Sequence, residues 1–191
     1  MTSKPPDAIN DTYITKTSRE IYRGPFFSLR EYLVEFPNGE EKKRIILEHP
    51  GAAAAVALLP DGKILMVRQY RKAAGKVTLE IPAGKLDEGE TPEECIEREL
   101  MEETGYRTDR LTHLRSYYPS FGISSEIIHV YLSEDLHPVE SSGGDEICLE
   151  PVIISLDEVK ELIESGEIMD SKTIVGIREL ELVRVKDNTH Q

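Results

Sequence analysis

The segment GKLDEGETPEECIERELMEETGY, residues 84–106, constrains this chain more than any other. It places nine carboxylates between Asp87 and Glu103, against one arginine, Arg98. Acidic helices are common, and most of them are solvated faces. Like charges one helical turn apart nevertheless destabilise a helix, so such crowding also suits a site that binds a cation. The acids are therefore either a solvated face or ligands.

The ends of the acidic segment carry helix signals. Thr91 is a preferred N-cap residue, and Glu94 follows it by three positions, as in a capping box. Pro92 suits the first helical position. Gly105 suits the left-handed residue that closes a helix. The sequence predicts a helix over residues 92–104.

One face of this helix gathers carboxylates beside the core. Glu99 and Glu103 lie one turn apart with Glu102 next to them, and Ile96 and Leu100 form an adjoining apolar stripe. Partial burial of several carboxylates is costly without a counter-ion. Oxygen ligands in this number favour Mg²⁺ or Mn²⁺, which commonly bridge to substrate phosphates. We expect a divalent cation at this face.

Composition narrows the class of protein. The 191 residues, 39% of them hydrophobic, are enough to bury the core of one domain. A net charge of −13 repels nucleic acid, and no block of lysine and arginine offsets it. No segment resembles a signal peptide or approaches the ~18 apolar residues of a membrane span. We expect a cytoplasmic protein without nucleic-acid or membrane partners, in which Cys95 and Cys148 are packing residues.

Strand-like runs stand before and after the acidic helix. Asn38-Gly39 and Asp61-Gly62 are hairpin signals between such runs. The order of strands, helix, strands and helices argues for a mixed sheet with helices packed on it. The predicted strands lie within residues 26–36, 42–49, 51–60, 63–71, 77–84, 111–119, 125–132 and 148–155, and two further helices lie within residues 155–166 and 170–185.

The acidic segment also matches a known pattern. Gly84 is followed after five residues by Glu90, and after seven more by Arg98-Glu-Leu-Met-Glu-Glu-Thr-Gly105. This reproduces the Nudix box, with Tyr106 in place of the usual aliphatic residue. The chain resembles Nudix hydrolases, which cleave a nucleoside diphosphate linked to another group. The resemblance implies an α/β fold: an α/β/α sandwich with a mixed sheet, here with a small N-terminal antiparallel β segment.

The resemblance also assigns roles within the box. Glu99 and Glu103 correspond to principal Mg²⁺ ligands, with Mn²⁺ as a substitute, Glu102 to an additional ligand or water-mediated contact, and the carbonyl of Ala83 to a further ligand. Arg98, adjacent to Glu99, is expected to orient carboxylates. The remaining acids of the helix are read as a solvated face.

A general base for water need not lie in the box. In enzymes similar to ADP-ribose pyrophosphatases it comes from an acidic, glycine-rich loop before a strand. The stretch ESSGGDEICLEPV, residues 140–152, fits this description, with Glu146 as first candidate and Asp145 as second. A plain surface loop is the alternative, in which case Glu126 or Glu102 becomes the leading base.

Resemblance to the ADP-ribose pyrophosphatase subgroup extends over most of the chain, through VRQYR, LEIPAGKLDEGE and PSFGISSEIIHVYL. It implies that Arg71 approaches the diphosphate, that Glu80 approaches the ribose side and that Glu126 lies near the metals. A rim salt bridge is the alternative for Arg71. The chain has no tryptophan that could stack on adenine. An aromatic residue of the N-terminal segment would have to do so, and the candidates are Phe27, Phe26 and Tyr22.

The N-terminal segment also bears on assembly. An isolated hairpin is marginal in water, so residues 1–48 are expected to pack on a second surface. In similar enzymes that surface belongs to another subunit, which implies a homodimer whose N-terminal segments contribute to the nucleoside pocket. Residues 49–191 would then be the Nudix hydrolase domain.

Two classes of function remain open at this point. The first is Mg²⁺-dependent hydrolysis of ADP-ribose or a related nucleoside diphosphate sugar to a nucleoside monophosphate and a sugar phosphate. The second is a Nudix-fold ligand sensor without turnover. Within enzymes, GDP-mannose, NADH, dinucleoside polyphosphates and nucleoside triphosphates are alternative substrates. The complete set of box acids favours the enzyme.

Overall fold

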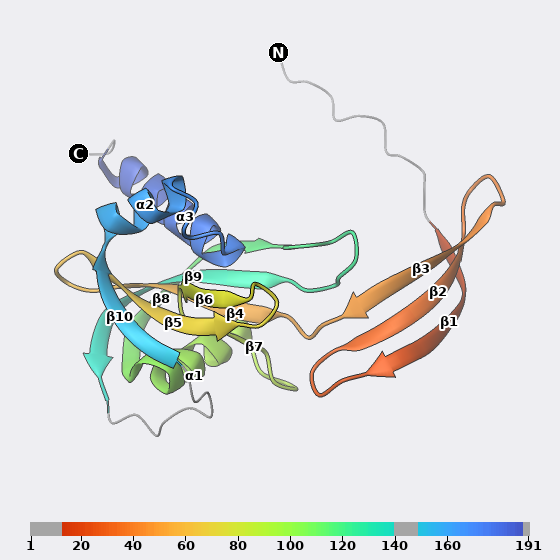
Figure 1. Cartoon of the computed structure of the whole chain (residues 1–191), viewed down its shortest axis with the longest axis horizontal. Coiled ribbons are helices and arrows are strands. Elements are labelled where there is room, and N and C mark those ends of the chain that lie inside the picture. The colour runs from red at the N-terminus through yellow and green to blue at the C-terminus, as the bar shows by residue number, and fades with distance from the viewer. Residues whose placement is uncertain (1–12, 140–148, 189–191) are drawn as a thin grey trace, which may run out of the picture. The chain divides into compact units, whose positions relative to one another are not determined.

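The computed structural model describes residues 13–139 and 149–188, which form two units, each with its own sheet (Figure 1). Contacts within the chain add a short later segment, residues 120–126, to the N-terminal unit. The assignment of separate roles to residues 1–48 and 49–191 stays a prediction. The two units comprise residues 13–49 with 120–126, and residues 50–119 with 127–139 and 149–188.

The N-terminal unit is a three-stranded antiparallel sheet. Its strands, in spatial order, are β1 (Ile14–Arg23), β2 (Ser28–Glu35) and β3 (Glu41–Glu48). The hairpin predicted at Asn38-Gly39 is confirmed, with Gly39 at φ 80° and the backbone N–H of Glu40 donating to Asn38 Oδ1 at 3.0 Å. The sequence analysis did not assign β1 as a strand. All ten of its residues are exposed in the structure, so this strand does not need the alternation of apolar and polar residues by which strands are recognised.

The second unit contains a seven-stranded mixed sheet. Five strands follow the order β10-β5-β4-β9-β8, while β6 pairs with β5 and β7 with β4. Only the β4–β9 pair is parallel among the pairs of this sheet in the described residues. The strands are β4 (Ala52–Leu58), β5 (Lys63–Arg71), β6 (Lys76–Glu80), β7 (Ala83–Lys85), β8 (Tyr106–Tyr117), β9 (Ile128–Pro138) and β10 (Leu149–Ser155).

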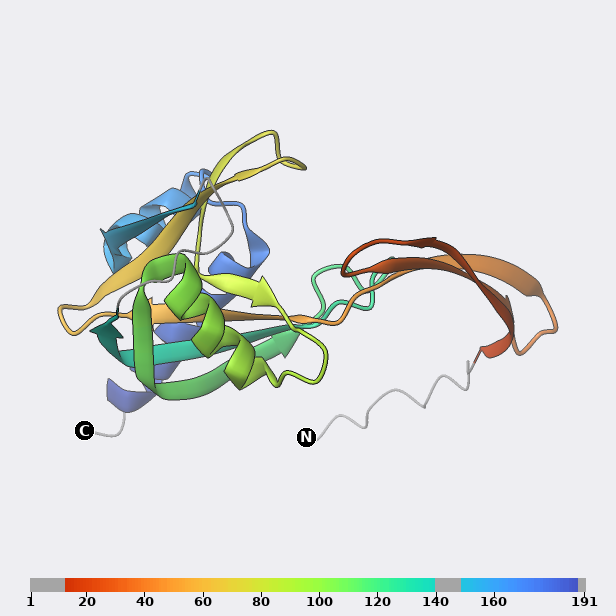
Figure 2. The same ribbon diagram turned by 90° about the horizontal axis from the view of Figure 1, so that it is seen from below.

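Within the described residues, three helices cover the two faces of this sheet: α1 (Pro92–Thr104), α2 (Leu156–Glu164) and α3 (Ser171–Asn188). In Figure 2 the green helix α1 lies in front of the sheet, and the blue helices α2 and α3 lie behind it. Strand β4 separates two hydrophobic clusters, because Ala54 and Val56 face one cluster while Ala53 and Ala55 face the other. The predicted α/β/α sandwich is confirmed.

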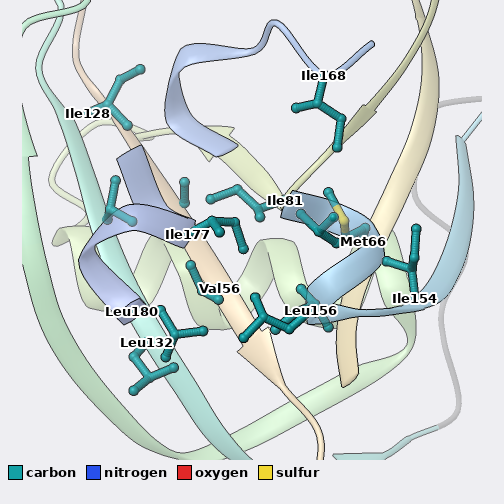
Figure 3. Packing of buried hydrophobic residues seen from close by; sticks show 14 residues of the cluster. Val56, Met66, Ile81, Ile128, Leu132, Ile154, Leu156, Ile168, Ile177 and Leu180 are labelled. Carbon is teal, nitrogen blue, oxygen red and sulfur yellow. The ribbon is translucent and has the colours of Figure 1, made fainter. Parts of the chain in front are cut away.

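The larger cluster lies between the sheet and helices α2 and α3. Val56 and Met66 of the sheet meet Leu156 of α2 and Ile177 and Leu180 of α3 (Figure 3). All five are 8% exposed or less. The second cluster, which holds Cys95, lies under α1, and the packing role expected for Cys95 is confirmed. Cys148 lies outside the described residues.

The boundaries predicted for the acidic helix are confirmed. The Thr91 side chain accepts a hydrogen bond from the N–H of Glu94, and the Glu94 carboxylate accepts one from the N–H of Thr91, so the capping box is complete. Gly105 closes the helix at φ 72°. These contacts are local in sequence, which is why the sequence sufficed to predict them.

One strand prediction is wrong in detail. Residues 77–84 were expected to form a single strand, but the structure divides them into β6, which ends at Glu80, and β7, which begins at Ala83. The two pieces pair with different neighbours, β5 and β4. Pro82 lies at the break, where its missing N–H costs no ladder bond and its carbonyl accepts from Ala55 N at 3.0 Å.

Within the residues that the structure describes, no helix is both long enough and apolar enough to cross a membrane.

Candidate active site

The site begins where α1 crosses β7. Glu99 of α1 lies so close to Gly84 of β7 that a β-carbon on Gly84 would stand 1.8 Å from Glu99 Oε1. Only glycine leaves that space, so the strand backbone forms a cradle for the carboxylate. The Glu99 side chain is 13% exposed. Its burial raises the pKa of the Glu99 carboxyl, against hydrogen bonding from Arg98, and the nearby Glu102 raises it further.

Glu103, one turn after Glu99, reaches the same strand. Its Oε2 accepts a hydrogen bond from the backbone N–H of Ala83 at 3.0 Å. Ala83 and Gly84 pair with Ala54 and Ala53 of β4, which fixes the strand on which both carboxylates converge. The structure therefore brings three of the predicted metal-binding positions together: Ala83, Glu99 and Glu103.

Arg98 connects the remaining carboxylates. Its Nε and Nη2 donate to Glu90 at 2.8 and 2.9 Å, and its Nη1 donates to Glu99 at 2.6 Å and to Glu102 at 3.3 Å. The fork from Arg98, against a smaller effect of burial, lowers the pKa of the Glu90 carboxyl to about 2. One guanidinium is thus shared by three carboxylates, and negative charge remains in excess.

This donor set fits a hard divalent cation. Carboxylates on one helix face, a buried carboxylate in a glycine cradle and an adjacent strand backbone are the oxygen donors that such ions prefer. Across the described part of the chain, no group of three His, Cys, Asp or Glu side chains is arranged to hold a metal ion. Glu99 and Glu102 instead contact Arg98, and Glu103 contacts Ala83 N. A cation would draw these carboxylates onto itself.

A second group of charges surrounds Glu80, the last residue of β6, three positions before β7 begins. This carboxylate, 2% exposed, accepts hydrogen bonds from Arg71 Nε at 2.9 Å, Arg71 Nη2 at 2.8 Å and Thr78 Oγ1 at 2.6 Å. It also accepts one from Lys172 Nζ. Burial opposes its ionisation, but the bonds from Arg71 and the charge of Lys172 outweigh burial and lower the pKa of Glu80 to about 2.

The Glu80 group borders a cavity of about 560 Å³. The cavity lies between the β5–β6 turn and the segment before α3, and it presents both charged and apolar side chains. Its volume is in the range of small-molecule sites. The lining residues are Arg71, Ala73, Ala74, Lys76, Thr78, Leu79, Glu80, Glu167, Ile168, Met169, Asp170 and Lys172.

Comparison with known proteins agrees with this geometry. The NUDIX domain family matches residues 48–171, which include the acidic helix and every residue that lines the cavity except Lys172. The chain belongs to the Nudix family. Nudix hydrolases generally use divalent metal ions, in accord with the excess of carboxylates on α1.

Several known proteins match most of the chain. An ADP-ribose pyrophosphatase from Bacillus subtilis (strain 168) is 41% identical over 88% of this chain and 92% of its own length. A methanol dehydrogenase activator from Bacillus methanolicus is 40% identical over the same shares. The crystal structure of an ADP compounds hydrolase, 23% identical, superposes with a TM-score of 0.79 over 91% of this chain and 95% of its own, so the fold is shared.

The other predicted site residues lie elsewhere in this Nudix chain. Phe27 and Glu126 belong to the N-terminal unit, which is described by itself. The Phe27 ring contacts Tyr22 and Phe26, with centroids 5.8 and 5.3 Å away, and Glu126 lies 3.8 Å from the Nδ1 of His49. The two candidate bases, Glu146 and Asp145, lie outside the described residues.

The sequence reasoning missed the partners of Glu80. The stretch Asp170-Ser-Lys-Thr173 opens α3, and its lysine and threonine both reach β6 and the residue after it. A usable signal existed, since lysine is unfavourable in the first turn of a helix and its presence there asks for a carboxylate partner.

The Gly84 cradle yields a prediction. In Gly84→Ala the new methyl group displaces the Glu99 side chain from Cγ outward, since Cγ lies 2.5 Å from the β-carbon position, and the side chain has to rotate away from the strand. We expect little change in the free energy of unfolding but a hydrolytic rate lowered by at least ~10²-fold at fixed metal concentration. Gly122→Ala is the control, because no atom lies within 4 Å of its β-carbon position. Denaturant titration measures the free energy of unfolding, and steady-state assays measure the hydrolytic rate. Equal rates for Gly84→Ala and Gly122→Ala would contradict a functional role for the Gly84 cradle.

The Glu80 group yields a prediction about pH. The pKa of Glu80 is about 2 in the folded protein, below its ordinary value of 4.5. Its carboxylate therefore contributes stability that is fully present above about pH 4.5 and is lost as the pH falls towards 2, on the order of 3 kcal/mol. Glu80→Gln should be less stable at pH 7 and lose less stability between pH 4.5 and pH 2.

Urea titrations across this pH range measure the effect on Glu80. Glu150→Gln on β10, which removes a carboxylate that is 71% exposed, is the matched control and should keep the parent profile. A Glu80→Gln profile parallel to that of the parent would show that Glu80 does not carry this dependence.

Proposed function

We propose that this Nudix protein hydrolyses the diphosphate bond of ADP-ribose or a related nucleoside diphosphate sugar, using Mg²⁺, to a nucleoside monophosphate and a sugar phosphate. The observation that carries the proposal is the Glu99 carboxylate held in the Gly84 cradle beside Glu103. The ADP-ribose pyrophosphatase that matches most of the chain supports the choice of substrate. The enzyme class, a Nudix pyrophosphohydrolase, rests on the family.

Each residue of the box has a distinct task in this proposal. Glu99, Glu103 and the carbonyl of Ala83 hold the ion, and Glu102, whose side chain is 37% exposed, contacts it directly or through water. Arg98 orients Glu99 and Glu102 by donating a hydrogen bond to each. When bound, Mg²⁺, with Mn²⁺ as a substitute, neutralises phosphate oxygens and lowers the pKa of an attacking water.

Arg71 supplies the contact to the diphosphate. Its side chain is 40% exposed and lines the cavity, and a guanidinium matches the geometry of phosphate oxygens. Both oxygens of Glu80 already accept hydrogen bonds from protein donors. A direct contact between Glu80 and the ribose would have to replace one of these bonds, so Glu80 contributes by holding Arg71.

A second candidate function is action through a protein partner. The relative named methanol dehydrogenase activator supports it, since its name describes an effect on another protein. A ligand sensor without turnover belongs to the same class. Glu99 and Glu102 share one arginine, and Glu103 lies beside them on the strand backbone. This excess of negative charge favours the enzyme, because a sensor has no need of it.

A substrate panel tests the proposal. The protein is incubated with Mg²⁺ and, separately, ADP-ribose, GDP-mannose, UDP-glucose, NADH, diadenosine polyphosphates and nucleoside triphosphates, and products are separated by chromatography. We expect AMP and ribose 5-phosphate from ADP-ribose as the fastest reaction. Binding of ADP-ribose without products would favour the sensor, and a faster reaction with another compound would reassign the substrate.

Glu103→Gln tests the chemistry in the same assay. We expect turnover to fall by at least ~10²-fold, because a neutral amide weakens binding of Mg²⁺ and does not offset its charge. Folding should survive, since one carboxylate leaves a repelling cluster. Glu97→Gln, an exposed position on the same helix, is the matched control. Parent-like turnover of Glu103→Gln at saturating Mg²⁺ would refute the assignment of this ligand.

Glu146 is the proposed general base, with Asp145 as second candidate. A base acts on water as the transition state forms, so Glu146→Gln should lower turnover and leave KM and the Mg²⁺ requirement nearly unchanged. A raised Mg²⁺ requirement would make it a metal ligand instead. If Glu146→Gln, Asp145→Asn and the double variant all retain the parent rate, the base is Glu126 or Glu102.

The proposed assembly is a homodimer through the N-terminal unit, with Phe27 in the nucleoside pocket. This unit exposes large apolar side chains, on its strands and next to them, which supports burial against a second copy. They are Tyr13, Ile14, Ile21, Tyr22, Phe26 and Ile45. Light scattering after size exclusion should give twice the chain mass of 21.6 kDa, and one chain mass at micromolar concentration would contradict the dimer. A cytoplasmic location stays a prediction from the sequence.

A further inference from the structure

Lys172 stands where a lysine is electrostatically unfavourable. Asp170 caps α3, because its Oδ2 accepts hydrogen bonds from Thr173 N at 3.0 Å and Thr173 Oγ1 at 2.6 Å. Lys172 therefore lies in the first helical turn, where the helix dipole disfavours a cation. It is also only 9% exposed, although lysine is almost never fully buried unless it is paired. Both features indicate that its charge serves a local purpose.

Two carboxylates hold the ammonium group of Lys172. Its Nζ donates to Asp170 Oδ1 at 3.1 Å and to Glu80, which comes from β6, 92 residues away in sequence. Asp170 is already engaged as a helix cap, so it stays fixed beside the lysine. Lys172 thus connects the start of α3 to a buried carboxylate of the central sheet.

Glu80 passes this restraint on to Arg71. The Nε and Nη2 of Arg71 donate to Oε1 and Oε2 of Glu80, and this fork fixes the plane of the guanidinium. Oε2 is the oxygen that also accepts from Lys172. Because Oε2 accepts from both cations, the carboxylate cannot rotate about its last bond without losing the bond to Lys172 as well as the fork, so Lys172 adds to the restraint on the fork. The orientation of Arg71 therefore depends on Lys172.

Charge balance points the same way. Arg71 and Lys172 are two cations, and Glu80 and Asp170 are two anions, so the four side chains together are neutral. Without Lys172 the group would carry one net negative charge beside a cavity proposed to receive a diphosphate. Like charge at this short range opposes binding of a phosphate.

The neighbouring residue Thr173 already fills the structural role that Lys172 could have. Thr173 Oγ1 accepts a hydrogen bond from Ile81 N at 3.0 Å and so already attaches α3 to the residue after β6. Since the anchor exists without Lys172, the buried ammonium is available for a different task. The two neighbouring residues therefore allow anchoring and positioning to be tested separately.

We propose that Lys172 is a positioning residue for substrate binding: it holds Glu80 so that Arg71 presents its guanidinium to the diphosphate, and it cancels the charge of Asp170 beside the cavity. This inference rests on the proposed function, in which Arg71 contacts the diphosphate. Lys172 itself does not need to touch the substrate.

The test is a double-mutant cycle between Lys172→Met and Arg71→Ala. We expect Lys172→Met to raise KM for ADP-ribose about tenfold with kcat nearly unchanged, since it removes binding common to ground and transition states. In the Arg71→Ala background the same change should raise KM less than about twofold, because residues that act through one another are not additive. Lys172→Arg should restore KM to within about threefold of the parent, because charge and reach are largely kept.

Thr173→Val is the matched structural control. It removes the hydrogen bonds of Thr173 Oγ1 with Ile81 N and with Asp170, while the Thr173 N–H still holds Asp170. It should lower the midpoint of thermal unfolding and leave KM at the parent value. Calorimetric titration of metal-free protein with ADP-ribose repeats the comparison without turnover, and it should show the same loss of affinity in Lys172→Met. Both readouts separate a positioning role from general destabilisation.

The outcomes test the positioning role of Lys172 separately from the proposed hydrolytic function. An unchanged KM in Lys172→Met, or equal effects of Lys172→Met with and without Arg71, would overturn the positioning role while hydrolysis of ADP-ribose by the parent still stood. If the panel identifies another nucleoside diphosphate as substrate, the cycle is measured with that compound. A parent that neither binds nor hydrolyses any compound of the panel would overturn both.

Discussion

The close approach of Glu99 to Gly84 is the contact on which the rest of the site depends. It requires α1 to lie almost against β7, and β4 makes this possible. Ala53 and Ala55 of β4 face α1, and Ala53 also pairs with Gly84 itself. Small side chains on the strand let the helix backbone come near, so the alanine run of β4 sets the distance between helix and strand.

Arg98 explains how the fold tolerates this arrangement. Four carboxylates gather along one side of the box, and a buried carboxylate without a partner is strongly unfavourable. Arg98 satisfies Glu90 with a fork and reaches Glu99 and Glu102 with its third nitrogen. Because one cation is shared by three acids, the compensation is incomplete. The folded chain is thus compatible with its own charges and still attracts a divalent cation.

The two charged groups of the second unit are joined by one short segment. Glu80 ends β6 and Ala83 begins β7, and the residues between them are fixed on both sides. Ile81 N donates to Thr173 of α3, and the carbonyl of Pro82 accepts from Ala55 of β4. Arg71, which would contact the substrate, and Glu99, which would hold the cation, are therefore both positioned by this one fixed segment of the chain. Rigid support of this kind is what holds reacting groups in register.

How much of this could be read from the sequence depends on the range of each interaction. The helix from Pro92 to Thr104 was predictable to the residue, because its caps and its carboxylates act within one turn of each other. The break between β6 and β7 was not, because it arises from pairing with two different strands. A one-dimensional pattern shows alternation, but it does not show which neighbour a strand takes.

The Lys172–Glu80 pair is the clearest case of what sequence patterns omit. The two residues stand 92 positions apart, and neither belongs to the box that identifies the family. Their sequence contexts nevertheless differ from background, since one is a lysine in the first turn of a helix and the other a glutamate at the end of a strand, between Leu79 and Ile81. Each is locally unfavourable, and each becomes favourable only in the other's presence. Unfavourable charges in an otherwise consistent sequence therefore indicate where partners must meet, and a functional site is where a fold most often retains them.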